Sequence, residues 1–333
     1  MKINPVGILL MIVSAIVSGC NTRSDSGDKI EYELVSKWPQ LLSGYTLGQP
    51  TGIGVDSNEH IFVFHRAGRK WTTPFPDSLI AKNTILELEN ETGKILNSWG
   101  ANFFIMPHGL TVDHNNHIWV TDVGLHQIFK FSHDGKLLME LGVPKISGND
   151  SLHFNLPTDV AVAADGSFYV SDGYGNSRVV KFSSSGKYLF EWGTPGKGQG
   201  EFDTPHGITL DESGNVFVAD RENNRIQVFD SQGAFIKELK NNESVAQLPS
   251  VTMDRGQNLF AIDYDNTKNP DSLVKGSTII KYEKAESILF HFGATGEKKR
   301  TPSWFHDISV DRQGNLYVGD IIGNKILKYK IQP

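Results

Sequence analysis

Cysteine is nearly absent from this sequence, since Cys20 is the only one in 333 residues. A single cysteine excludes an internal disulfide and a metal cluster built on thiolates. Blocks of like charge are also absent, and the net charge is −6, which argues against a nucleic-acid partner. What the chain does have is 38% hydrophobic residues and 33 glycines. These suit a large core and a fold with many tight turns.

The N-terminal segment has the pattern of an export signal. A charged start is followed by the apolar stretch Val6–Val17, too short for a good membrane span, and by small residues before Cys20. The Gly-Cys ending resembles the signal of bacterial lipoproteins, in which the cysteine becomes the lipidated first residue; an uncleaved anchor and an ordinary signal are the alternatives. We therefore expect a signal peptide at 1–19 and a flexible tether over 20–29 behind a lipid on Cys20. Such a protein crosses the inner membrane and stays anchored on the periplasmic side or in the cell envelope.

The rest of the chain repeats a unit of 44 to 57 residues. The unit is clearest from Pro205 to Leu239, where short runs rich in β-branched and aromatic residues alternate with turn residues. Its four expected strands are Gly207–Leu210, Val216–Ala219, Arg225–Phe229 and Ala234–Leu239. The copies begin near Pro50, Pro107, Pro157, Pro205, Pro249 and Phe305.

Four antiparallel strands per unit at this period predict the blades of a β-propeller. Six copies predict one all-β, six-bladed domain over residues 30–333. The sixth copy stops after its third strand, Ile326–Lys330. We expect the N-terminal strand Glu31–Val35 to supply the missing outer strand and close the ring.

Histidine occurs at one position of alternate copies. The first strand of a blade lines the central channel, and its starting residue in the six copies is Thr51, His108, Thr158, His206, Ser250 and His306. A lone histidine at a strand start is usually structural, but three on alternate blades are expected about 120° apart and directed at the axis. A His₃ site with an open fourth position suits catalytic Zn²⁺, although Cu or Fe would also accept imidazole.

The loop after the second strand reaches the same rim of the channel, because adjacent strands run antiparallel. We expect the aspartates found there to cap and hold the loop; they are Asp122, Asp172, Asp220, Asp263 and Asp320. The first copy has His65-Arg66 instead, and the third adds Tyr174 two residues after its aspartate. An arginine can clamp a carboxylate through its planar fork. A tyrosine beside a metal cation can lose its proton and act as a base.

Two long loops crowd this rim, Ala67–Asn83 and Asn266–Gly276. Long loops on one face of a rigid scaffold usually shape a binding site. Arg69, Trp71 and Phe75 are expected either to line that site or to pack the first loop down.

These residues resemble the catalytic domain of the peptidyl-α-hydroxyglycine α-amidating lyases, six-bladed propellers with NHL-type repeats. The resemblance runs from about Leu41 to Tyr329. The matching stretches are Phe64–Arg66, Met106–Leu110, Val120–Asp122, Leu125–Gln127, Pro157–Val162, Ser171–Tyr174, Asn176–Arg178, Ala219–Asn223 and His306–Ile308.

The resemblance implies roles for the residues at these positions. The catalytic zinc would be held by His108, His206 and His306, while Arg66 and Tyr174 would be the catalytic arginine and tyrosine. The implied reaction splits peptidyl-α-hydroxyglycine into a peptide amide and glyoxylate. The substrate would be a small molecule or peptide with an α-hydroxyglycine-like end.

The resemblance also implies a structural calcium in the channel, held by Asp307 and by the backbone carbonyls of Ile53 and Leu110. The last two occupy the same position in their strands, and calcium prefers such oxygen ligands. In the sixth copy Trp304-Phe305-His306 stands where the family has Met-Pro-His, and Gly175 stands where the animal enzymes have a cysteine.

Two other functions stay open at this point. One is a non-catalytic NHL propeller that binds a ligand or protein partner. The other is a metal-dependent lactonase or esterase propeller, which would call for carboxylate and amide ligands on the axis where this chain has histidines. In each case we expect a monomer without a nucleic-acid partner.

Overall fold

The computed structural model describes residues 32–240, 247–264, 277–293 and 303–332. The expected signal peptide, the tether and the loop Asn266–Gly276 lie outside these ranges. Within them, no helix is both long and apolar enough to cross a membrane.

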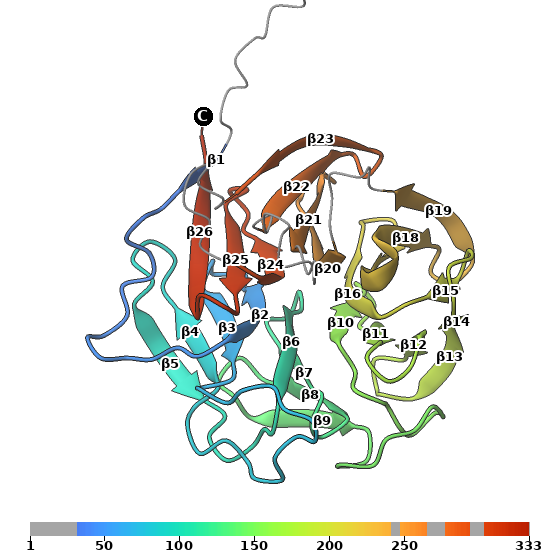
Figure 1. Ribbon diagram of the computed structural model, residues 1–333, viewed down its shortest axis with the longest axis horizontal. Helices are drawn as coiled ribbons and strands as arrows, with labels where there is room; N and C mark the ends of the chain where they lie inside the picture. The colour runs from blue at the N-terminus through green and yellow to red at the C-terminus, as the bar shows by residue number, and fades with distance from the viewer. Residues whose placement is uncertain (1–31, 241–246, 265–276, 294–302, 333) are drawn as a thin grey trace, which may run out of the picture.

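Six four-stranded antiparallel sheets stand around a central channel like blades (Figure 1). The first three blades consist of β2 (Pro50–Val55), β3 (Ile61–His65), β4 (Ile85–Leu88) and β5 (Ile95–Trp99); β6 (Pro107–Val112), β7 (Ile118–Asp122), β8 (Gln127–Phe131) and β9 (Leu137–Leu141); and β10 (Asp159–Val162), β11 (Phe168–Asp172), β12 (Arg178–Phe182) and β13 (Tyr188–Trp192). This order confirms the predicted all-β, six-bladed propeller.

The other three blades follow the same order. They consist of β16 (Pro205–Leu210), β17 (Val216–Asp220), β18 (Arg225–Phe229) and β19 (Phe235–Lys240); β20 (Gln247–Met253), β21 (Leu259–Tyr264), β22 (Thr278–Glu283) and β23 (Ser287–Phe292); and β24 (Phe305–Val310), β25 (Leu316–Asp320) and β26 (Lys325–Ile331) with β1 (Tyr32–Leu34). A short parallel pair, β14 (Thr194–Pro195) and β15 (Glu201–Phe202), lies between the third and fourth blades.

The first and last segments of the described chain share the sixth blade. Strand β1 pairs with β26, with Tyr32 opposite Ile331 and Leu34 opposite Tyr329. The ring of Tyr32 stacks on Phe292 of the fifth blade at 4.7 Å between centroids. The predicted closure by an N-terminal strand is therefore confirmed.

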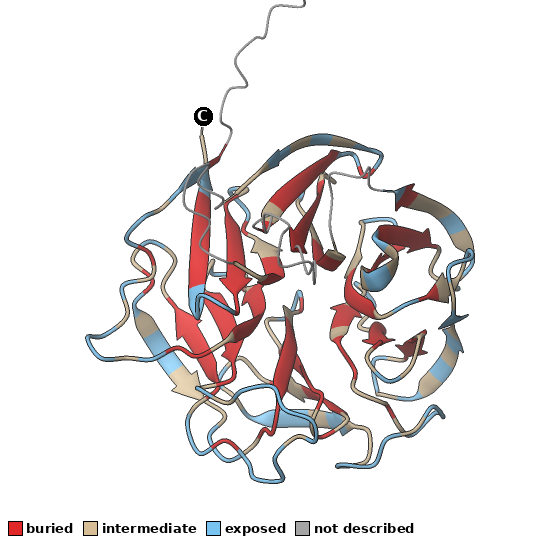
Figure 2. Ribbon diagram, viewed as in Figure 1, coloured by how far each residue is buried: buried red, intermediate tan, exposed pale blue. Residues whose placement is uncertain are grey.

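Burial falls from the middle of each blade to its outer edge (Figure 2). Every residue of β7 is buried, whereas β9, the outer strand of the same blade, alternates between exposed and half-buried. The middle strands are covered on both faces by neighbouring blades, which explains their nearly continuous apolar sequence. Each outer strand pairs with one strand only, and its exposed positions mix polar residues such as Glu140 with apolar ones such as Leu137 and Leu138.

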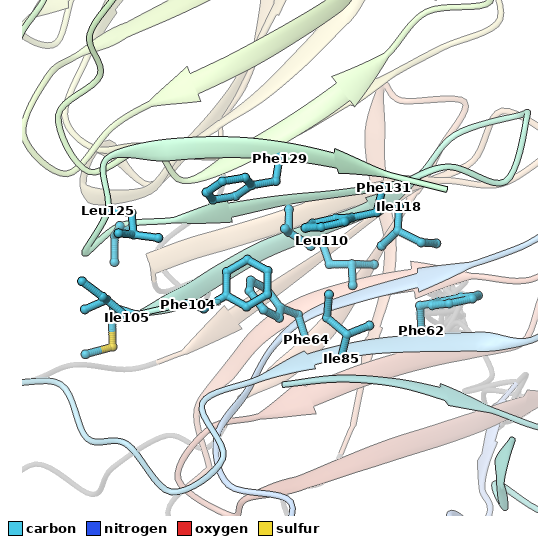
Figure 3. Close-up of a cluster of buried hydrophobic side chains, with 13 residues drawn as sticks. Phe62, Phe64, Ile85, Phe104, Ile105, Leu110, Ile118, Leu125, Phe129 and Phe131 are labelled. Carbon is cyan, nitrogen blue, oxygen red and sulfur yellow. The ribbon is translucent and has the colours of Figure 1, made fainter. Parts of the chain in front are cut away.

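The largest aromatic cluster lies between the first and second blades (Figure 3). Phe64 and Phe104 meet edge to face at 4.8 Å between centroids, and Phe62 lies at one end of the same cluster. Edge-to-face contacts of this kind add to the stabilisation from area burial alone. These contacts hold the two blades that carry Arg66 and His108 against one another.

One sequence alignment was wrong. Strand pairing places Val251 opposite Ala261, as Leu110 lies opposite Val120. Counting back two residues, Pro249 and not Ser250 occupies the position of His108. The fifth copy therefore begins one residue earlier than expected, at Leu248, because no proline marks its start. Ser250 instead occupies the position of Asp307.

Candidate functional site

Three histidines meet on the channel axis. His108, His206 and His306 are the second residues of β6, β16 and β24, and all three are buried. Their ring centroids lie 4.6 to 5.0 Å apart, and one ligand nitrogen from each lies within 4.8 Å of the others. The structure thus brings together the three residues that the alternating repeat pattern selected.

The backbone of the next blade orients each imidazole. Nδ1 of His108 lies 2.7 Å from the carbonyl of Thr158, Nδ1 of His206 lies 2.7 Å from that of Pro249, and Nδ1 of His306 lies 2.8 Å from that of Thr51. A carbonyl only accepts, so each Nδ1 carries the proton and each Nε2 keeps its lone pair. Such outer hydrogen bonds fix the ring and the tautomer of metal-binding histidines.

The glycine after the histidine allows this approach between blades. A Cβ on Gly109 would lie 2.5 Å from the carbonyl oxygen of Thr158, and one on Gly207 would lie 2.6 Å from Cα of Ser250. A larger residue would push the inner strands apart. The recurring Pro-His-Gly is therefore a packing requirement as well as a ligand position.

The three imidazoles are neutral. Burial is the main cause of the lowered pKa of each one. A neighbouring histidine lowers the pKa of His108 and of His206 further, and the Arg221 charge lowers all three. The pKa of His306 falls to about 3. Its buried Nε2 has no hydrogen-bond partner among the described residues. Three neutral, convergent nitrogens, one of them an unpartnered buried atom, fit a divalent transition metal.

Tyr174 lies directly beside this centre. Its hydroxyl oxygen is 3.1 Å from Nε2 of His108 and 3.0 Å from Nε2 of His206. Arg221 donates from Nη1 to the same oxygen at 3.1 Å, and its guanidinium lies over the tyrosine ring, 5.0 Å from the centroid. A phenol held next to a cation and a metal site is positioned to lose and regain a proton.

Arg66 is a second buried cation at the site. Its Nε donates to the carbonyl of Pro107 at 3.2 Å and its Nη1 to Oε1 of Gln49 at 2.8 Å. Burial lowers its pKa to about 10, so it stays charged at neutral pH. Both of these hydrogen-bond partners are neutral. In the described part of the chain no carboxylate forms an ion pair with Arg66. A buried cation without a counter-ion is costly unless a ligand supplies the anion.

The first long loop contributes one wall. Trp71 packs on Tyr174 at 5.3 Å between ring centroids, and the Arg66 guanidinium lies 5.0 Å from the Trp71 ring. Arg69 instead donates to the carbonyls of Ser78 and Ile105 and holds the loop down. Of the alternatives left open by the sequence, Trp71 lines the site and Arg69 packs the loop.

The aspartates after the second strands hold the loops. Asp122 accepts from the backbone N–H of Ile105, Met106 and Leu125. Burial raises its pKa to about 6, although those N–H groups favour the carboxylate. In the first blade His65 replaces the aspartate and accepts from the N–H of Ala67 at 3.1 Å. Arg66 follows directly at the end of this strand.

Below the histidines the channel carries two buried carboxylates. A cavity of about 260 Å³ is lined by Asp307, Asp159, Ile53 and Leu110, among others. Asp307 accepts from the Ile53 N–H and from the Ser250 hydroxyl, each at 2.6 Å. Burial raises its pKa to about 7, and burial together with the Asp307 charge raises the pKa of Asp159.

Two protonatable carboxyls in one buried channel fit a hard cation that neutralises both. The sequence analysis named Asp307, Ile53 and Leu110 but assigned no role to Asp159. Asp159 occupies the same repeat position as Asp307, opposite Ser171 as Asp307 is opposite Gly319. Listing that position in all six copies would have found it.

Comparison with known proteins assigns the family. The NHL repeat family matches residues 104–131, 154–182 and 202–229. Peptidyl-alpha-hydroxyglycine alpha-amidating lyase 2 of Drosophila melanogaster is 34% identical over 320 residues, which span 89% of this chain and 75% of that protein. The chain belongs to the family of peptidyl-α-hydroxyglycine α-amidating lyases. It is thus a member of a family of carbon–nitrogen lyases.

Other relatives of this lyase family are longer. Peptidyl-glycine alpha-amidating monooxygenase B of Xenopus laevis is 34% identical over 318 residues, which cover 90% of this chain but 36% of that protein. The chain therefore spans about a third of that relative's length. Among solved structures, "Streptogramin B lyase structure" covers 90% of this chain and 97% of its own with a TM-score of 0.57 and 17% identity. That likeness shows the propeller fold.

For a chain of this lyase family, the sequence analysis missed Arg221 as a site residue. It recognised the stretch Ala219–Asn223 but gave the arginine no role. Arg221 begins a single 3₁₀ turn, η1 (Arg221–Asn223), which directs its side chain to Tyr174. Arg221 follows Asp220 as Arg66 follows His65 at the equivalent strand end, so comparing that position between copies would have found it.

Proposed function

We propose that this protein is a zinc-dependent peptidyl-α-hydroxyglycine lyase, which cleaves the C–N bond of an α-hydroxyglycine group to give an amide and glyoxylate. The observation that carries the proposal is the position of the Tyr174 hydroxyl. It lies within 3.1 Å of two metal-binding nitrogens and of the Arg221 guanidinium. A purely structural zinc is normally closed by a fourth protein ligand, whereas a catalytic one keeps a position open.

His108, His206 and His306 would hold the zinc through Nε2. When bound, zinc supplies a Lewis acid that polarises a substrate oxygen. The other contributions come from the protein's own side chains.

Arg66 would bind the substrate carboxylate. Its Nε and Nη1 already donate to Pro107 and Gln49, so Nη2 would pair with the ligand. A guanidinium fixed in this way loses little freedom when it pairs with an anion. It would hold the α-carbon and its hydroxyl at Tyr174.

Tyr174 would accept the hydroxyl proton at its phenolic oxygen, to which Arg221 donates a hydrogen bond. The O–H electrons form the new C=O bond of glyoxylate while the C–N bond breaks. The departing amide nitrogen takes up one proton, so the reaction consumes no net proton. Trp71 covers the tyrosine ring and would limit the access of water.

Calcium is the second metal in the proposal. Asp307 and the carbonyls of Ile53 and Leu110 would hold it in the channel, with Asp159 as a further carboxylate that lines the same cavity. Oxygen ligands of this kind suit calcium. The ion would balance the buried carboxylates next to the zinc ligands.

The proposal for location follows from the N-terminal pattern. Export across the inner membrane and a lipid on Cys20 would tether the propeller on the periplasmic side or in the cell envelope. Labelling of the cells with a radioactive fatty acid tests this, with Cys20→Ser as the control that should remain unlabelled.

The decisive assay is glyoxylate release from an α-hydroxyglycine peptide or α-hydroxyhippurate, with and without a chelator. We expect chelation to abolish release and zinc to restore it. Tyr174→Phe should retain zinc but lose roughly 10²- to 10⁴-fold in kcat, the usual contribution of a general base. Full turnover by that variant would disprove the base role, and Tyr188→Phe, on the outer strand β13, is the matched control.

The same preparation tests the rival functions. Hydrolysis of esters or lactones in place of C–N cleavage would indicate a hydrolase. No turnover of either substrate class, with zinc bound, would indicate a binding module.

A further inference from the structure

Outside the channel, four potential metal ligands meet between the first and second blades. They are Asp56 and His60 in the turn between β2 and β3, Glu87 on β4, and His133 in the turn between β8 and β9. Their ligand atoms all lie within 4.8 Å of one another. We propose that this cluster is a second transition-metal site, with a structural zinc or similar ion that ties the two blades together.

The distances suit a tetrahedral ion. Nδ1 of His60 lies 2.7 Å from Oε1 of Glu87 and 3.7 Å from Oδ2 of Asp56. Nε2 of His133 lies 2.7 Å from Oδ2 of Asp56 and 3.9 Å from Oε1 of Glu87. Ligands about 2.0 Å from a tetrahedral zinc are about 3.3 Å from one another. The four separations straddle that value, so small side-chain rotations would complete the site.

The position of Glu87 in the repeat is the main argument. Strand pairing places Glu87 opposite Phe62, and the same position of four other blades carries a lysine opposite an aromatic residue. These lysines are Lys130, Lys181, Lys281 and Lys328. Their ammonium groups lie 4.9 to 5.7 Å from the facing ring.

Lysine is therefore the usual residue at this position of the third strand of a blade. Nζ of Lys181 donates to the carbonyl of Ser231, and Nζ of Lys328 to that of Asn90, each at 2.8 Å. Ser231 and Asn90 lie in the adjoining blade's turn, at the position that His133 holds in the second blade. Each of these two lysines thus connects its blade to the next.

The first blade reverses the charge at this place. Glu87 cannot donate to the next blade, and it faces a second carboxylate, Asp56. Asp56 and Glu87 are 4% and 7% exposed, and no lysine or arginine in the described ranges pairs with either. His133 takes the place over the Phe62 ring, at 5.2 Å between centroids. In the second blade Lys130 lies 4.0 Å from Asp113, the counterpart of Asp56. Glu87 replaces that ammonium in the first blade, so two carboxylates and two imidazoles meet there.

The ligands are held in place by their own backbone contacts. Oδ1 of Asp56 accepts from the N–H of Asn58 at 2.8 Å and of His60 at 2.7 Å, which leaves Oδ2 directed at the histidines. The side chains of His60 and His133 are 30% and 35% exposed, which gives an ion access from solvent. Four protein ligands with no open position indicate a structural site, separate from the His₃ centre.

The repeat itself supplies the test variants. Glu87→Lys installs the residue found at Lys130 and Lys328, and His133→Ser installs the residue found at Ser231, so both should fold. Zinc content is measured by elemental analysis after dialysis against a small excess of zinc. We expect one equivalent less zinc in each variant than in the wild-type protein, with zinc-dependent thermal protection reduced accordingly.

His206→Ala, which removes a ligand of the channel centre, separates the two sites. In that background, added zinc should raise the unfolding midpoint by about 3 °C or more, and this rise should disappear when Glu87→Lys is added. With Co²⁺ in place of zinc, a tetrahedral visible absorption band should follow the same pattern. Equal metal content in the wild type, Glu87→Lys and His133→Ser would overturn the proposal and leave two ordinary histidine–carboxylate pairs.

Discussion

Nη1 of Arg221 lies 3.1 Å from the hydroxyl oxygen of Tyr174, and the guanidinium covers the tyrosine ring. Burial by itself lowers the pKa of Arg221, but the charges of Tyr174, Tyr264 and Glu222 outweigh burial and raise it. Arg221 therefore remains a cation against the tyrosine. This contact connects the fourth blade to a residue of the third and makes Tyr174 part of a charged network.

Replacement of Arg221 by glutamine should lower kcat. The guanidinium donates to the hydroxyl oxygen of Tyr174, so the variant loses a charged hydrogen bond to the proposed base. Such a bond is worth about 1.5 to 3 kcal/mol, so kcat should fall roughly 10- to 150-fold. Steady-state kinetics measure the loss.

Arg221→Lys serves as the control because it keeps the positive charge. It should recover most of the wild-type kcat, whereas a merely structural role would lower the unfolding midpoint of both variants along with kcat. An unchanged kcat for Arg221→Gln would rule out the electrostatic role.

Replacement of Arg66 by lysine should weaken substrate binding. A lysine cannot keep the bonds to Pro107 and Gln49 and also present a third donor, because it lacks the planar fork. The loss of a charged hydrogen bond costs about 1.5 to 3 kcal/mol, so KM should rise roughly 10- to 150-fold. Steady-state kinetics measure this.

A substrate analogue in which an amide replaces the carboxylate is the control for Arg66. It should bind poorly to the wild-type protein and no worse to Arg66→Lys. Equal KM effects on both compounds would mean that Arg66 does not read the carboxylate.

The repeat in the sequence predicted most of the fold, and it also predicted the site residues that lie at equivalent positions of different blades. His108, His206 and His306 were found because one strand position recurs, and the rim position of Arg66 and Tyr174 followed from blade geometry. The register of the fifth copy was misjudged because Leu248 replaces the proline that marks the start of the first four copies. This one-residue error assigned Ser250 to the repeat position of His108, whereas it occupies that of Asp307.

Other residues were missed for different physical reasons. Arg221 holds the repeat position of Arg66, but its role depends on a contact with Tyr174 that joins positions 47 residues apart. The Asp56 cluster joins two blades through His133, which shows no pattern in the sequence. Glu87 was overlooked because one glutamate in a strand means little until strand pairing places it where other blades have lysine.

Calcium should stabilise the protein more at alkaline than at acid pH. Burial raises the pKa of Asp307 from its ordinary 3.8 to about 7. Between these values the ion-free folded state binds more protons than the unfolded state, so this group makes the ion-free protein less stable as pH rises. Calcium requires the deprotonated carboxylate and removes that penalty.

Thermal unfolding at pH 5, 6, 7 and 8, with calcium or with a chelator, tests this expectation. The gain from calcium should be small at pH 5 and largest above about pH 7, with about 2.7 kcal/mol at a hundredfold excess over Kd. Asp307→Asn should abolish both the gain and its pH dependence. A gain that is independent of pH would place the ion elsewhere.

Ring closure should depend on one side chain of β1. Tyr32 is 5% exposed and stacks on Phe292 at 4.7 Å, with Phe260 at 6.1 Å. Tyr32→Ala leaves a cavity between the fifth and sixth blades and should lower the free energy of unfolding by about 3 to 5 kcal/mol, as for other large aromatic truncations. Leu34→Ala, two residues along the same strand and 41% exposed, should cost less than about 1 kcal/mol. Chemical denaturation of both variants measures the difference. Strand β1 pairs with β26 and so closes the ring. A large loss of unfolding free energy in Tyr32→Ala alone would show that the side chain of the closing strand stabilises the whole ring. Equal losses in both variants would mean that β1 adds only its backbone hydrogen bonds.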